Sequence, residues 1–130
     1  MIPVSRLMTK NVLKVNNDAI IKDVAVVMKD EKVGSLLVAK DEKVVGIITE
    51  TDIIQKVVAD DLNPYVTKAE SIMSAPLLCI DVNKTIIDAN DMMDQRHVRH
   101  LGVTDGEDIV GILSVRDILH PLYFKEDEGW

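Results

Sequence analysis

The stretch Gly46-Ile47-Ile48-Thr49-Glu50-Thr51-Asp52 recurs 65 positions later as Gly111-Ile112-Leu113-Ser114-Val115-Arg116-Asp117. Both copies contain a glycine, an apolar pair, a hydroxyl residue and, three residues further on, an aspartate. The similarity extends without a gap from Met8–Ile54 onto Met73–Leu119. Self-similarity at a fixed spacing indicates a duplicated structural unit. The repeated polar residues therefore predict two related sites.

Length and composition are those of an ordinary globular protein. With 130 residues, 47% hydrophobic and 28% charged, the chain is long enough to bury a core without metals or disulfides. Aromatic residues make up only 3%, so the core is expected to be aliphatic. The formal net charge of −7 argues against general nucleic-acid binding, which depends on Lys and Arg.

The expected location is cytoplasmic, with no membrane partner. The chain shows neither a signal-like N-terminus nor an apolar run long enough to span a bilayer. Cys79, the single cysteine, lies in an apolar run and cannot form an intrachain disulfide.

Hydrophobic periodicity predicts the same order of elements, β-α-β-β-α, in both copies. In the first copy we expect a strand at 12–15, a helix from the N-cap pair Asn17-Asp18 to Gly34, a hairpin of strands 35–39 and 44–49, and a helix at about 51–59. In the second copy we expect a strand at 77–80, a helix at 85–96 after an N-cap at Asn83, strands at 101–104 and 109–114, and a short helix ending at Pro121.

These elements predict one module of α/β (α+β) class. Repeat one covers 4–60, a linker 61–68, repeat two 69–123 and an acidic, mobile tail 124–130. Helical turns at Val4–Met8 and Ala69–Met73 precede the first strand of each repeat. A single copy would leave a sheet face uncovered, so we expect the two repeats to pack through their sheets with pseudo-twofold symmetry.

Each residue type in the repeated motif has a physical role at a junction between a strand and a helix. Gly46 and Gly111 allow another backbone or a ligand ring to approach closely. A hydroxyl residue can cap the following helix, whose N-terminus favours an anion such as phosphate. The aspartate can accept hydrogen bonds from two neighbouring hydroxyls, such as those of a ribose. Together these groups suit a nucleotide.

Structural interpretations of the same residues stay open. Thr49 and Ser114 could serve only as N-caps, and Asp52 and Asp117 as first-turn carboxylates that favour the helix dipole. His97, Arg99 and His100 could be solvated polar groups between a helix and a strand. Cys79 on an apolar strand is a poor candidate for a Cys-His nucleophile pair, and the sequence has neither metal-ligand spacing nor a P-loop. We therefore expect a protein that is not an enzyme.

At these residues the chain resembles a tandem pair of cystathionine β-synthase (CBS) domains, from about Val4 to Leu122. The repeat spacing, the element order and both hydroxyl-x-x-carboxylate motifs match. The stretch Val98-Arg99-His100-Leu101-Gly102-Val103 adds to the resemblance, because the family often has a basic pair followed by Leu-Pro-Val there. Gly102 departs from this pattern by replacing the proline.

The resemblance implies two clefts that bind adenosine-containing ligands, each built from both repeats. The residues implied for the first cleft are Thr49, Asp52, Arg99, His100 and Arg116, with Ile47 and Val98 as apolar walls for the base. Those implied for the second cleft are Ser114, Asp117, Gly34, Ser35 and Thr51.

The alignment makes the two clefts unequal. Gly34 and Ser35 stand where Arg99 and His100 stand, so only the first cleft has cations for a phosphate. A hydrogen bond to a charged group contributes about 1.5–3 kcal/mol. We therefore expect one stronger site for a phosphorylated nucleotide, and one that is weaker, empty or suited to a less charged ligand.

The predicted function is that of a regulatory module that binds AMP, ADP, ATP or a related adenosine ligand, with no required cofactor. The resemblance also implies a homodimer, and the signal would pass to an unidentified regulated protein. The alternative is a structural dimerisation or interaction module with vestigial clefts.

Overall fold

The computed structural model describes residues 1–119, which fall into two compact units. The repeat-one unit is Leu13–Leu77, and the repeat-two unit joins Met1–Val12 to the chain from Leu78 onward. The predicted helix end at Pro121, the end of repeat two at 123 and the acidic tail lie outside the described residues.

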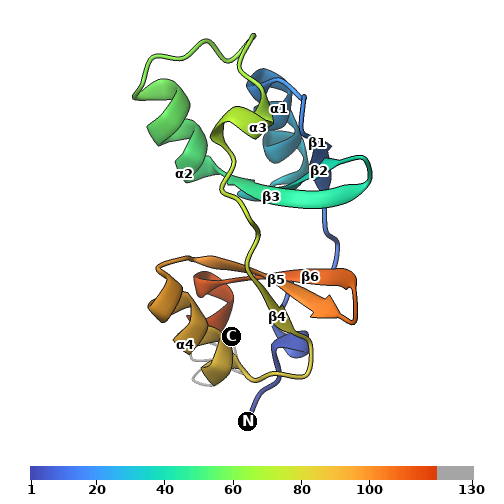
Figure 1. The fold of residues 1–130 in the computed structure, drawn as a ribbon. Coiled ribbons are helices and arrows are strands. Elements are labelled where there is room, and N and C mark those ends of the chain that lie inside the picture. Colours follow the sequence, from blue (N-terminus) through green and yellow to red (C-terminus); the bar gives the residue numbers. More distant parts are fainter. Residues whose placement is uncertain (120–130) are drawn as a thin grey trace. The chain divides into compact units, whose positions relative to one another are not determined.

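The repeat-one unit contains a three-stranded sheet with helices (Figure 1). Strand β1 runs parallel to β2, and β2 runs antiparallel to β3. The elements in chain order are β1 (Lys14–Asn16), α1 (Ile21–Glu31), β2 (Ser35–Lys40), β3 (Lys43–Thr49), α2 (Glu50–Asp52), the π-helical η2 (Ile53–Val58) and α3 (Ala69–Ile72).

The repeat-two unit has the same topology, with β4 parallel to β5 and β5 antiparallel to β6. Its elements are the 3-10 turn η1 (Val4–Arg6), β4 (Cys79–Asp81), α4 (Ile86–Arg96), β5 (His100–Asp105) and β6 (Asp108–Ser114), and residues 115–119 are helical. The predicted β-α-β-β-α order is confirmed in both units. The expected pairing of the two units through their sheets stays a prediction.

The duplication includes the irregularities of the hairpins. The ladder of β2 and β3 shifts register between Val38 and Ala39, and that of β5 and β6 shifts between Val103 and Thr104. These positions are equivalent in the two copies. The same bulge twists each hairpin at the same point and fixes which side chains face the helices.

Each unit buries its own aliphatic core, as the composition predicts. Leu36, Val38 and Ile48 alternate along β2 and β3 and meet the apolar face of α1. The buried core residues of the repeat-one unit are Ile21, Val24, Met28, Leu36, Val38, Ile48, Val57, Ala69 and Ile72. Those of the repeat-two unit are Val4, Ile80, Ala89, Met93, Leu101, Val103 and Leu113.

Three predicted helix ends are wrong. Helix α1 has Ile20 as its N-cap, because the side chain of Asn17 instead donates to Glu70 Oε2 at 2.6 Å. The C-cap of the same helix is Lys32, which takes the left-handed conformation with φ 56°, and not Gly34. Helix α4 is capped by Thr85 and not by Asn83, whose main-chain N–H binds Asp81 Oδ1 in the preceding turn.

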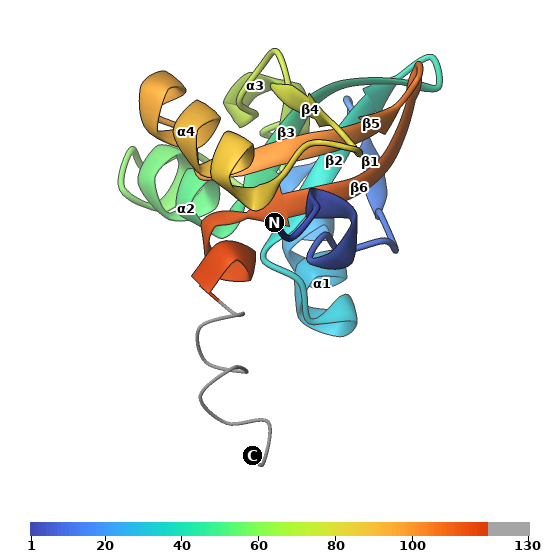
Figure 2. The ribbon, with the colours of Figure 1, turned by 90° about the horizontal axis from the view of Figure 1, so that it is seen from below.

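The segment that precedes the first strand of each repeat packs on the unit of the other repeat. Thr9 bridges to Ile112 of β6, and Ser74 bridges to Ile47 of β3. The N-terminal segment accordingly lies beside β6 (Figure 2). The repeats defined by sequence are therefore not the units that fold together.

This packing explains the glycine of the repeated motif. A Cβ on Gly46 would lie 2.7 Å from Ser74 O, and one on Gly111 would lie 3.0 Å from Thr9 O and 2.6 Å from Met8 Sδ. Both glycines thus allow a backbone to approach, which is one of the two roles predicted for them.

Candidate functional site

The first hydroxyl-carboxylate pair forms a reciprocal cap where β3 ends and α2 begins. Asp52 Oδ2 accepts from the Thr49 main-chain N–H at 3.0 Å and from the Thr49 hydroxyl at 3.1 Å. The Asp52 main-chain N–H in turn donates to Thr49 Oγ1 at 3.2 Å. The capping role predicted for Thr49 is therefore confirmed.

The second pair repeats this geometry after β6. Asp117 Oδ2 accepts from the Ser114 main-chain N–H at 2.7 Å and from its hydroxyl at 3.1 Å. The Asp117 main-chain N–H donates to Ser114 Oγ at 3.3 Å. Both aspartates are therefore held in a fixed orientation by the start of the following helix.

A third reciprocal cap, or capping box, lies outside the repeated motif and shows what helix capping alone requires. Thr85 and Asp88 at the start of α4 make the same three bonds, at 3.0, 3.1 and 3.3 Å. Asp88 is exposed, whereas Asp52 keeps only 7% of its surface exposed. A capping box does not itself require a buried carboxylate, so the burial of Asp52 needs a further reason.

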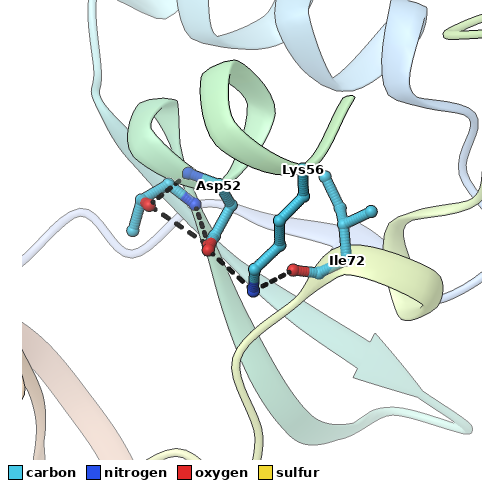
Figure 3. A network of polar contacts seen from close by, with 4 residues as sticks. Asp52, Lys56 and Ile72 are labelled. Carbon is cyan, nitrogen blue, oxygen red and sulfur yellow. Dashed lines mark hydrogen bonds and ion pairs between the residues drawn. The ribbon is translucent and has the colours of Figure 1, made fainter. Parts of the chain in front are cut away.

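Lys56 completes the surroundings of Asp52 (Figure 3). Its Nζ lies 3.0 Å from Asp52 Oδ1 and donates to the main-chain oxygen of Ile72 at 2.9 Å. The lysine thereby links the carboxylate to α3. Lys56 is not among the predicted site residues, although its position four residues after Asp52 in the helix predicted at about 51–59 was a usable signal.

The predicted basic residues lie together at one end of the β5-β6 hairpin. His100 is paired with Ser114 across the ladder, and the main-chain oxygen of Arg99 accepts from the Val115 N–H at 2.9 Å. Arg99 and Arg116 are exposed and His100 is half-buried. We call Arg99, His100, Val115 and Arg116 the repeat-two edge.

The equivalent positions form the repeat-one edge, which consists of Gly34, Ser35, Glu50 and Thr51. Ser35 is paired with Thr49, and Gly34 O accepts from the Glu50 N–H at 3.0 Å. The two edges thus share one backbone framework and differ in side chains. The predicted joining of each edge with the aspartate of the other repeat in one cleft stays a prediction.

The two predicted apolar walls have structural roles within their own units. Ile47 is 7% exposed, and its main chain exchanges two hydrogen bonds with Ser74, at 3.0 and 2.8 Å. Val98 is half-buried against the repeat-two core, and its N–H donates to Met93 O. Contact of either residue with an adenine base stays a prediction.

Metal binding, cysteine chemistry and membrane spanning can be assessed for residues 1–119, the part of the chain that the structure describes. Residues 1–119 contain no group of three or more His, Cys, Asp or Glu side chains placed to hold a metal ion. Burial raises the pKa of the Cys79 thiol, which makes it a weaker nucleophile at neutral pH. No helix within residues 1–119 has the length and apolar character needed to cross a membrane.

The duplicated topology and motifs define the family. The CBS domain model matches residues 4–59 and 69–123, so the chain belongs to the CBS domain family as a tandem pair. Tandem CBS domains are commonly regulatory ligand-binding modules, and their relatives are named as domain-containing proteins and not as enzymes.

Known proteins similar to the chain include an uncharacterized protein of Methanocaldococcus jannaschii. It is 31% identical over an aligned length of 129 residues, and the alignment covers 89% of this chain and 31% of that protein. The chain spans 31%, 18% and 50% of the lengths of three curated relatives that it matches.

Two solved structures share the fold over nearly the whole chain. An uncharacterized conserved protein from Pyrococcus horikoshii matches at 30% identity with a TM-score of 0.85, covering 93% of this chain and 92% of that one. A hexameric CBS-CP12 protein from bloom-forming cyanobacteria matches at 30% identity with a TM-score of 0.87, covering 97% of this chain and 74% of that one.

Proposed function

We propose that the chain is a regulatory module that binds an adenosine nucleotide such as AMP, ADP or ATP through its oriented aspartates. The observation that carries the proposal is the buried Asp52 carboxylate, which the Thr49 cap holds at the end of β3. A fixed carboxylate oxygen can accept a hydrogen bond from a ribose hydroxyl without reorganisation.

The repeat-two edge supports a phosphorylated ligand. Arg99 and Arg116 are exposed guanidinium groups that present donors in a rigid fork, which matches phosphate oxygens. His100 adds an imidazole side chain to the same edge. In a protein with a formal net charge of −7, such a local cluster is the place where an anion would bind.

Regulation would follow if the nucleotide binds two conformations of the protein with different affinity. A bound ligand shifts a conformational equilibrium only as far as it prefers one state. AMP and ATP differ in charge at the end that would meet the repeat-two edge, so they would bias such an equilibrium differently. The signal would pass to a partner protein or to a second copy of the chain.

Thermal unfolding in the presence of adenosine, AMP, ADP and ATP tests the proposal, followed by calorimetric titration of the best ligand. A ligand that binds the folded state raises its stability by mass action. We expect Asp52→Ala and Arg99→Ala each to weaken AMP binding about tenfold, which corresponds to about 1.4 kcal/mol.

Asp88→Ala is the matched control, because it removes an aspartate from the same kind of capping box outside the motif. It should lower stability without changing affinity. The proposal fails if no adenosine ligand shifts the unfolding temperature, or if Asp52→Ala and Arg99→Ala bind AMP like the unchanged protein.

A second candidate function, protein interaction, is favoured by exposed apolar side chains on η2. Ile54 and Val58 lie four residues apart and are 60% and 69% exposed. Side chains at this spacing share one helix face, which could contact a second copy of the chain. Sedimentation tests this interaction: Ile54→Glu should produce monomers, whereas Val26→Glu on α1, where Val26 is 40% exposed, should not.

A further inference from the structure

The two edges differ by a correlated exchange of residues at two neighbouring positions. Where the repeat-two edge has Arg99 and Val115, the repeat-one edge has Gly34 and Glu50. In both edges the first residue of the pair accepts a main-chain hydrogen bond from the second, at 2.9 Å and 3.0 Å respectively. The backbone is therefore conserved between the units, while the charge changes from positive to negative.

Glu50 lies over the glycine of its own edge. A Cβ built on Gly34 would be 2.6 Å from Glu50 Oε1, 3.4 Å from its Cδ and 3.8 Å from its Cγ. The side chain therefore folds back across the position from which an arginine side chain would begin. The Glu50 carboxylate therefore covers the position that corresponds to the Cβ of Arg99 in the repeat-two unit.

The neighbouring residues do not offset this charge. Ser35 and Thr51, which replace His100 and Arg116, are neutral. No ion pair with Glu50 is present within residues 1–119, and the one described ion pair joins Lys56 to Asp52. Glu50 is exposed, so its field acts on whatever approaches the edge.

We propose that Glu50 is a specificity-determining residue that excludes phosphate from the repeat-one edge, so that this edge accepts an adenosine ligand without a phosphate group. This inference rests on the proposed function and deepens it, because it adds active repulsion to the absence of cations. Like charges a few ångströms apart repel even near a protein surface, and a phosphate carries up to two negative charges.

Calorimetric titration of the full chain with AMP tests the proposal, with adenosine as the uncharged probe. Glu50→Gln removes the charge and keeps the shape. We expect it to strengthen the weaker of two AMP binding steps about tenfold, and to leave the stronger step and adenosine binding unchanged. The double change Gly34→Arg with Glu50→Val, which installs the residues of the repeat-two edge, should strengthen the weaker step further.

Glu42→Gln is the matched control. It makes the same charge change in the same unit, at the turn of the β2-β3 hairpin, where Lys40 pairs with Lys43. The repeat-one edge lies at the opposite end of that hairpin, where Ser35 pairs with Thr49. Glu42→Gln should leave both AMP steps unchanged.

The outcomes separate this inference from the function on which it rests. If the unchanged protein binds no AMP, the proposed function fails and the inference fails with it. If AMP binds in a step sensitive to Asp52→Ala, but the weaker step is unaltered by Glu50→Gln and by the double change, only the role of Glu50 is overturned. Two AMP steps of equal strength in the unchanged protein would overturn it as well.

Discussion

Asp52 and Asp117 occupy equivalent positions but differ in how many acceptor positions they have left. A carboxylate offers about four lone-pair directions. Two are used by the cap in each case, and Lys56 uses a third on Asp52. No hydrogen bond within residues 1–119 involves Asp117 Oδ1. The carboxylate that would be joined with the cations is thus the less open of the two.

Lys56→Met should therefore strengthen adenosine binding at Asp52 by a few-fold, because two ribose hydroxyls would no longer compete with the ammonium group for Oδ1. The variant should lose about 1–3 kcal/mol of stability, because it leaves the Asp52 carboxylate, whose side chain is 10% exposed, without its ion-pair partner. Calorimetric titration with adenosine and urea unfolding measure these quantities, with Lys43→Met in the hairpin turn as control. Weaker binding by Lys56→Met would instead identify Lys56 as a ligand contact.

The close backbone contact at Gly46 predicts that an added methyl group lowers stability more at Gly46 than at Gly34. Gly46→Ala should destabilise the protein by about 1–3 kcal/mol, because its Cβ meets a main-chain oxygen of Ser74 that cannot move away cheaply. Gly34→Ala is the control: its Cβ meets only the end of the exposed Glu50 side chain, and the change should stay within about 1 kcal/mol. Urea unfolding compares them, and equal losses would contradict the assigned role of Gly46.

At the scale of elements, the three hydroxyl-carboxylate boxes show how a helix start fixes a carboxylate. In the box of α4, hydrogen bonds from the Thr85 main chain and hydroxyl, together with the charge of Lys84, hold the pKa of Asp88 below its usual range, against a smaller opposing effect of desolvation. A lowered pKa in the folded state means that the ionised carboxylate stabilises the fold.

Asp88→Asn should accordingly reduce stability at pH 7 and have progressively less effect in acid. Because the folded pKa is lowered, the contribution of Asp88 is fully present above the unfolded value of about 3.9 and is lost as the pH falls through the lower folded value. Urea midpoints of both proteins between pH 7 and acid measure the difference. A gap that stays constant as the pH falls would show that the ionised carboxylate is not the cause.

The sequence predicted the elements whose signals are local. The hairpin strands followed from β-branched runs on both sides of polar turns, and α4 from its periodicity. The helix starts at Asn17 and Asn83 were wrong because each of these residues hydrogen-bonds elsewhere, and only tertiary context decides between such partners. The contact of Lys56 with Ile72 joins residues 16 apart in sequence, so no pattern in the sequence could reveal it.

At the scale of the whole molecule, sequence repeats and folding units differ by one exchanged segment each. Residues 1–12 precede the first strand of repeat one but belong to the unit of repeat two, and the segment that precedes the first strand of repeat two, up to Leu77, belongs to the unit of repeat one. Sequence similarity fixes where a motif recurs. It does not reveal which sheet a connecting segment joins, because that choice depends on backbone pairing with a distant strand.

Deletion of residues 1–9 should therefore destabilise the repeat-two unit and not the repeat-one unit, which follows these residues directly in the chain. The segment buries Val4 completely, and its main chain exchanges two hydrogen bonds with Ile112 and accepts one from Ile86. Burial of a valine alone contributes about 1.5–3 kcal/mol.

Hydrogen exchange of the chain that lacks residues 1–9 shows where stability is lost, because it reports local stability amide by amide. We expect the amides of Ile86 and Ile112 to lose protection first, while those of Ile47 and Ser74, paired with each other in the repeat-one unit, keep theirs. Val4→Ala should produce the same pattern more weakly, since it shortens the buried side chain and keeps the backbone pairing. Loss of protection that begins in Leu13–Leu77 would show instead that the first segment stabilises the repeat it precedes, as contiguity in sequence suggests.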